Sequence, residues 1–63
     1  MTPDTTWFLC GPNEGWKVER YGATVTVIDS AGLIREAIVY DNEDEAREAV
    51  GNLADAAYAG RWK

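Results

Sequence analysis

Histidine is absent from this chain of 63 residues, and cysteine and serine occur once each, as Cys10 and Ser30. Without histidine and with a single thiol, the chain lacks the nitrogen and sulfur ligands of a zinc site. The single serine lies in a turn sequence and has no histidine to activate it as a nucleophile. A single cysteine also excludes an intrachain disulfide. We therefore expect no enzymatic activity, no metal and no cofactor.

Long hydrophobic runs are also missing. No stretch approaches the roughly 20 apolar residues of a membrane-spanning helix. The start of the chain, residues 1–4, lacks the basic character of a signal peptide. The cytoplasm is therefore the expected location. In that reducing compartment we expect Cys10, between Leu9 and Gly11, to be a small buried hydrophobic residue.

The chain has enough apolar residues, 46%, to favour one folded domain over a disordered segment. Its formal net charge is −5, and residues 41–48 carry −4 of it, because five acids there outnumber one arginine. These acids are Asp41, Glu43, Asp44, Glu45 and Glu48. Acidic residues are favoured at the first turn of a helix by the helix dipole. The alternative interpretation is a docking patch for a basic partner, which would make the protein an acidic decoy.

Four segments rich in β-forming residues predict strands at about 5–10, 16–21, 23–28 and 33–40. Turn sequences recur between them every eight to twelve residues, which favours hairpins joined in an antiparallel meander. Parallel pairing would need longer crossover connections than the chain can supply. The first segment is short and close to the terminus, so we expect three or four strands.

A helix is predicted over residues 43–59, because apolar residues recur there with helical spacing. The apolar stripe consists of Ala46, Ala49, Val50, Leu53, Ala54, Ala57 and Tyr58. Asn42 with Glu45 is one candidate for the N-terminal capping pair, and Asp41 with Asp44 is the other. Gly60 is expected to end the helix. The predicted fold class is therefore α+β, with one C-terminal amphipathic helix packed on one face of the sheet.

A single helix can cover only one face of the sheet, yet large apolar residues occur in both alternating phases of the predicted strands. The uncovered face is therefore expected to be an interaction surface. Our candidate interaction residues are Trp7, Trp16, Val18, Tyr21, Ile34, Ile38 and Tyr40. Two alternatives remove the exposed face: a strongly curled sheet, or a C-terminal tail that folds Trp62 over it.

The leading functional hypothesis is a non-enzymatic protein-interaction or regulatory module that forms a homodimer through this face. The small size would suit an accessory protein of a phage or mobile element. The alternative is a nucleic-acid-binding domain that combines sheet aromatics with Lys17, Arg20 and Arg35. The negative net charge weakens that hypothesis. These cations would otherwise pair with Glu19 and Glu36 on neighbouring strands.

The segment Gly15-Trp16-Lys17-Val18-Glu19-Arg20, followed by Gly22-Ala23, resembles a family of very short bacterial proteins of uncharacterised function. Members of that family have a hairpin around Gly-Trp-x-Val-x-Arg-x-Gly and then a capped helix with Glu-Ala near its start. In this sequence Asp41 and Glu45-Ala46 would match the helix, whereas residues 24–36 form an additional hairpin. The strand and helix order also looks like the first half of antitoxin domains that dimerise through sheet edges. The resemblance supports the fold and implies no activity.

Overall fold

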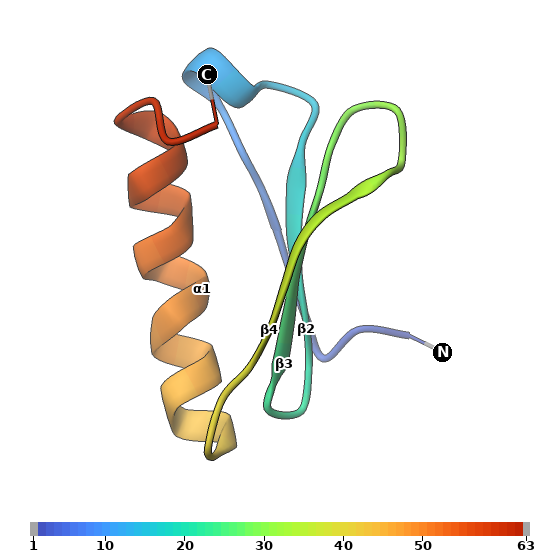
Figure 1. Cartoon of the computed structure of the whole chain (residues 1–63), viewed down its shortest axis with the longest axis vertical. Helices are drawn as coiled ribbons and strands as arrows, with labels where there is room; N and C mark the ends of the chain where they lie inside the picture. Colours follow the sequence, from blue (N-terminus) through green and yellow to red (C-terminus); the bar gives the residue numbers. More distant parts are fainter. Residues whose placement is uncertain (1, 63) are drawn as a thin grey trace.

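Four antiparallel strands form a sheet in chain order, and one helix lies along one face of it (Figure 1). The computed structural model describes residues 2–62. The elements are β1 (Thr5–Phe8), the 3-10 turn η1 (Gly11–Asn13), β2 (Lys17–Tyr21), β3 (Thr24–Ile28), β4 (Ile34–Val39) and α1 (Glu43–Tyr58). The predicted α+β meander is confirmed, and its first segment joins the sheet as a fourth strand. The prediction of strand 5–10 is two residues too long, because the pairing ends at Phe8.

Glycines with positive φ shape the two hairpins that follow β2 and β3. Gly22 (φ +60°) begins a two-residue loop between β2 and β3, and Ala23 has no positive φ, which is the type II′ pattern. After β3, the Asp29 carboxylate accepts hydrogen bonds from the backbone N–H groups of Ala31 and Leu33, at 2.9 and 3.0 Å. Gly32 (φ +85°) then completes the turn in a conformation that favours glycine.

The core lies between α1 and the two central strands. Val18 of β2 and Val25 and Val27 of β3 have no exposed surface. The helix contributes four buried residues to the same cluster, which are Ala46, Val50, Leu53 and Ala57. Alanine at two of these positions lets the helix backbone approach the sheet closely, so the sheet valines supply much of the apolar volume.

Both ends of α1 are capped as local sequence rules predict. The Asn42 side chain accepts a hydrogen bond from the Glu45 N–H at 2.9 Å, so Asn42 is the N-cap. At the other end Gly60 has φ +99°. The N–H groups of Gly60 and Arg61 donate to the carbonyls of Ala57 and Ala56, each at 3.0 Å. This pair of bonds is a Schellman motif, which confirms Gly60 as the end of the helix.

The expectation for Cys10 is wrong, and so is the alternative in which Trp62 covers the free face of the sheet. Cys10 is exposed, because it follows the buried Leu9 and the alternation of the extended chain directs it to the opposite side. Trp62 does not cover the free face of the sheet. Its ring lies 6.1 Å from that of Trp16, and both tryptophans pack against the core cluster on the α1 side.

Candidate functional site

The sheet face opposite α1 is covered by no helix or strand within residues 2–62 (Figure 1). The strand register identifies its side chains, because directly paired residues share a face. The face consists of Thr6, Phe8, Lys17, Glu19, Tyr21, Thr24, Thr26, Ile28, Ile34, Ala37 and Val39. Phe8, Ile34 and Val39 are 74%, 64% and 77% exposed. We refer to this surface as the open face.

A polar group occupies the middle of the open face. The Lys17 ammonium lies 3.6 Å from the Glu19 carboxylate. The Tyr21 hydroxyl donates a hydrogen bond to the same carboxylate at 3.3 Å. Partial burial raises the pKa of Tyr21 above its ordinary value of 10.0, and the negative charge and hydrogen bond of Glu19 raise it further. The open face therefore combines an apolar periphery with a balanced ion pair near its centre.

The structure divides the predicted interaction residues between the two faces. Only Tyr21 and Ile34 lie on the open face. The other five lie on the α1 side, and they are Trp7, Trp16, Val18, Ile38 and Tyr40. The prediction that these five residues lie on the uncovered face is therefore wrong, because the strand register directs their side chains toward α1. Val18 has no exposed surface and belongs to the core.

Sequence reasoning missed Phe8 and Val39, the two most exposed apolar residues of the open face. A signal for them was present in β3, where valine alternates with threonine. Valines at 25 and 27 are better suited to the core than the intervening threonines. With the valines directed toward the core, the threonines of β3 lie on the open face. The hairpin register then determines which residues of the neighbouring strands lie on each face.

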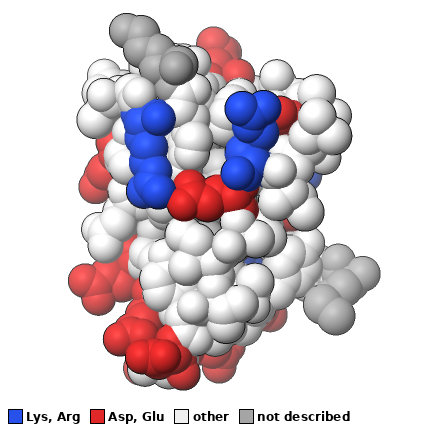
Figure 2. Space-filling model, in the orientation of Figure 1, with Lys and Arg blue, Asp and Glu red and all other residues white. Residues whose placement is uncertain are grey.

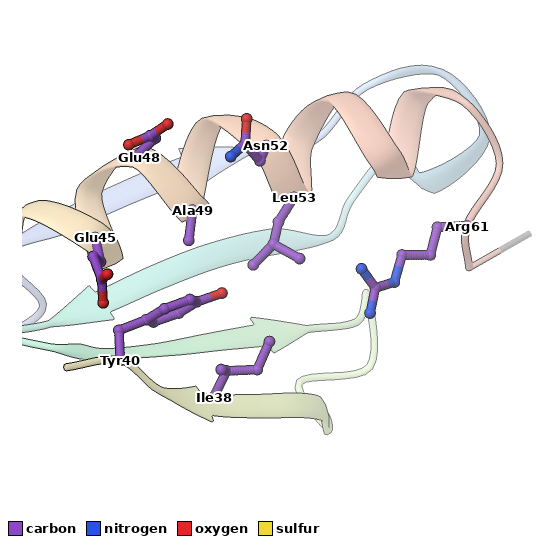
Figure 3. A pocket seen from close by; sticks show the side chains of 8 residues that line it. All are labelled: Ile38, Tyr40, Glu45, Glu48, Ala49, Asn52, Leu53 and Arg61. Carbon is purple, nitrogen blue, oxygen red and sulfur yellow. The ribbon is translucent and has the colours of Figure 1, made fainter.

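A groove runs between α1 and the edge strand β4 on the other side of the sheet (Figure 3). It exists because α1 packs chiefly on β2, β3 and η1 and leaves β4 less covered. Its volume is about 420 Å³. The lining residues are Ile38, Tyr40, Glu45, Glu48, Ala49, Asn52, Leu53 and Arg61. We refer to it as the α1–β4 groove.

Arg20, one of the three predicted nucleic-acid contacts, is a buried structural residue. It is 7% exposed and lies beside the start of α1. Its guanidinium donates to the Gly22 carbonyl at 2.9 Å and to the Thr5 hydroxyl at 3.3 Å. It also donates to the Glu43 carboxylate at 3.3 Å. Arg20 therefore joins β1, the β2–β3 turn and α1.

The other two candidate cations, Lys17 and Arg35, lie on opposite sides of the sheet. Lys17 pairs with Glu19 on the open face, but both residues belong to β2, so the expected pairing across neighbouring strands is wrong. Arg35 pairs with Asp29 at 3.5 Å and lies 5.6 Å from the centre of the Trp16 ring on the α1 side. Glu36, the partner expected for one of these cations, binds Arg61 instead. The structure therefore does not bring the three cations together.

The acidic patch surrounds the beginning of α1, where Figure 2 shows acidic atoms gathered at one end of the molecule. Its members are exposed, and they are Asp41, Glu43, Asp44, Glu45 and Glu48. The Glu45 carboxylate accepts a hydrogen bond from the Asp41 N–H at 3.3 Å. Asp44 pairs with Arg47 at 3.1 Å. These contacts agree with an electrostatic role at the start of the helix.

Within residues 2–62, no three histidine, cysteine or acidic side chains lie close enough together to hold a metal ion. No helix in that part of the chain combines the length and the apolar character needed to cross a membrane. Comparisons with protein-family models, with curated proteins and with solved structures found no match.

Proposed function

We propose that this protein is a non-enzymatic interaction module that forms a homodimer through the open face of its sheet. The observation that carries the proposal is the exposure of Phe8, Ile34 and Val39, which lie on the two edge strands of one uncovered face. Antiparallel sheets with one solvated face normally present polar residues there. Apolar residues on such a face are typical of an interaction surface.

The open face is complementary to itself. Consider a two-fold axis that lies parallel to the open face, perpendicular to the strands and midway between Lys17 and Glu19. Rotation about this axis places the lysine of each copy over the glutamate of the other. The same axis places the Ile34 side chain over the smaller Ala37 of the second copy. Two sheets stacked in this way lie about 10 Å apart, with interdigitated side chains between them. A second copy of the chain is therefore the partner that this face fits.

The area of the open face determines how tight a dimer we expect. Four strands about 4.8 Å apart, each about 17 Å long, give a footprint of roughly 300 Å². Stable interfaces bury about 800 Å² of accessible surface on each partner. Even with the added area of protruding side chains, the open face lies at the small end of this scale. We therefore expect a reversible dimer with a dissociation constant on the order of micromolar.

Sedimentation equilibrium over about 5 to 500 μM tests the proposal, because this range spans the expected dissociation constant. The mass should rise from monomer to dimer across the range. The double variant Phe8→Lys with Val39→Lys should remain folded, since both side chains are exposed, and should remain monomeric. Tyr58→Lys is the matched control, because Tyr58 is also exposed but lies on α1, away from the open face. This control should dimerise like the wild type.

A wild-type protein that stays monomeric throughout this range contradicts the proposal. So does an equal loss of dimer in Tyr58→Lys and in the double variant. Among the described residues, Lys17 is the one cation of the open face, and its pairing with Glu19 does not favour nucleic acid as a partner. Salt-dependent binding of an oligonucleotide would support that alternative instead. A role as an accessory protein of a phage or mobile element stays a prediction from chain size.

A further inference from the structure

The outer edge of β4 is a free hydrogen-bonding edge within the described chain, because β4 is the last strand of the sheet. The Tyr40 N–H donates to the Ala23 carbonyl at 2.8 Å, so Tyr40 points its backbone groups toward β3. These directions alternate along an antiparallel strand. Ile38 therefore also faces β3, whereas Ala37 and Val39 direct their N–H and C=O groups outward.

The stretch Ala37–Tyr40 lacks the features that usually protect a sheet edge, which are charged residues, proline and bulges. The two charged residues of β4 lie nearer the start of the strand, and both form ion pairs. Arg35 binds Asp29, and Glu36 binds Arg61 at 2.8 Å. A second extended segment can therefore add to Ala37–Tyr40 without displacing an existing strand.

The α1–β4 groove lies beside this free edge, on the α1 side of the sheet. Figure 3 shows Tyr40 and Ile38 on the sheet below Ala49 and Leu53 of the helix, so the floor and inner wall are apolar. The volume of about 420 Å³ falls within the usual range of small binding sites. The Arg61 side chain reaches β4 at one end of the groove and binds Glu36 there.

The charge of the groove favours a basic ligand. Glu45 points toward the Tyr40 ring, and Glu48 lies at the outer rim (Figure 3). Both belong to the acidic patch, and both are exposed. Arg61 is the cation among the lining residues, and its ion pair with Glu36 offsets its charge. An arriving segment therefore meets an apolar floor and a net negative wall.

We propose that the α1–β4 groove binds an extended basic segment of another protein, which adds to β4 as a fifth strand. Backbone groups of the segment would pair with those of Ala37 and Val39. Its lysine or arginine side chains would lay their aliphatic stems over Ile38 and Tyr40 and direct their charged ends to Glu45 and Glu48. The alternation of such a segment matches the period of a strand, because every second side chain faces the groove.

This binding site goes beyond the proposed homodimer. The dimer uses the open face, and the groove lies on the opposite side of the same sheet. A dimer therefore leaves both of its grooves accessible. Failure of one proposal does not entail failure of the other, because the oligomeric state and the binding of a segment are measured separately.

The probe is the synthetic peptide Ac-Val-Lys-Val-Lys-Val-Lys-Val-NH2, titrated into the full chain labelled with 15N and followed by NMR. We expect saturable shift changes in the amides of Ala37 and Val39 and along the groove wall of α1. The matching peptide with glutamate in place of lysine should cause no saturable change. Absence of saturable binding of the lysine peptide at millimolar concentration overturns the proposal, as do shift changes confined to the open face.

Charge and edge pairing are tested separately. Glu45→Gln with Glu48→Gln should weaken the peptide about fivefold to tenfold, since two exposed ion pairs are lost. Glutamine at 45 can still serve the capping pair. The control is Asp55→Asn with Glu14→Gln, which removes the same charge at two exposed positions outside the groove. It should change the affinity less than about twofold, because distant exposed charges are screened. Equal weakening by both double variants overturns the proposal.

Backbone pairing is tested by N-methylation of the peptide. In an added strand, alternate N–H groups point toward β4 and the others point away. Two peptides are therefore made, one methylated at the odd positions and the other at the even positions. One of them should lose binding, and the other should retain it. If both methylated peptides still bind, the segment does not add to β4. If neither binds, pairing along one edge of the peptide does not explain the binding, and the proposal is also contradicted.

Discussion

Replacing Arg20 with methionine tests whether one buried guanidinium holds three segments of the chain together. Methionine retains much of the aliphatic bulk and removes the hydrogen bonds to the Gly22 carbonyl and the Thr5 hydroxyl. It also removes the ion pairs with Glu43 at 3.3 Å and with Asp4 at 3.8 Å. The Glu43 side chain is 59% exposed, so water can solvate it after the substitution. The loss of stability in Arg20→Met should therefore come chiefly from the two hydrogen bonds.

The magnitude follows from these contacts. The 2.9 Å bond from a charged group to the Gly22 carbonyl contributes about 1.5 to 3 kcal/mol, and the longer bond to Thr5 contributes about 1 kcal/mol or less. The two ion pairs, whose acidic partners are both more than half exposed, together add at most about 1 kcal/mol. Burial of an apolar methionine offsets part of the loss. We expect Arg20→Met to lower the free energy of unfolding by about 2 to 3 kcal/mol, out of roughly 3 to 9 kcal/mol for a chain of this length.

Urea unfolding followed by tryptophan fluorescence measures this loss. The transition midpoint should fall while the slope stays the same, because the surface exposed on unfolding is unchanged. Arg20→Lys should give an intermediate loss, since it keeps the charge but not the planar set of donors. The control Arg47→Met removes an exposed arginine and should cost less than about 0.5 kcal/mol. If Arg20→Met is as stable as the wild type, desolvation of the guanidinium cancels its bonds and the reasoning is refuted.

Three further predictions concern single residues. Gly51→Ala should raise the free energy of unfolding by about 0.5 to 1 kcal/mol in urea titration, because Gly51 lies inside α1, has no positive φ and leaves open space for a Cβ atom; a loss would show an unrecognised contact. The raised pKa of Tyr21 means that the folded state favours the protonated phenol, so its contribution to stability is complete below pH 10 and is lost as the pH rises through that pKa. In urea titrations above pH 10, Tyr21→Phe should therefore lose less stability than the wild type; equal losses would contradict this. The native Cys10 thiol should react with a thiol reagent at nearly the rate measured in urea, and strong protection would contradict its exposure.

The helix could be predicted closely from the sequence because its signals are local. The apolar stripe, the Asn42 cap and Gly60 each depend on residues within a few positions of one another. The hairpin turns are local in the same sense, and Gly22 and Gly32 mark two of them. The antiparallel meander could be predicted from these turns, whereas the number of strands stayed at three or four because the first segment is short.

Which side of each strand faces the helix was harder to predict, because within the sheet only β3, with its alternating valine and threonine, gives a clear signal. Trp16, directly before β2, and Val18 alternate with Tyr21, so large apolar or aromatic residues occur on both sides of this segment. Packing of α1 against Val18 decides which side is buried. The α1–β4 groove was missed for a related reason: it depends on the lateral position of α1 over the sheet, which no periodicity in the sequence specifies.

The meander also has a kinetic consequence. Every strand pairs with the strand next to it in the chain, so the sheet can form through short loop closures, which favours rapid folding. Two contacts of the turn that follows α1, residues 59–62, join it to distant parts of the described chain. Asn13 donates to the Trp62 carbonyl at 3.4 Å, and Arg61 binds Glu36. These contacts require both the sheet and the docked helix, so they are expected to form after the rate-limiting step. Changes in this turn should then accelerate unfolding and leave the folding rate nearly unchanged.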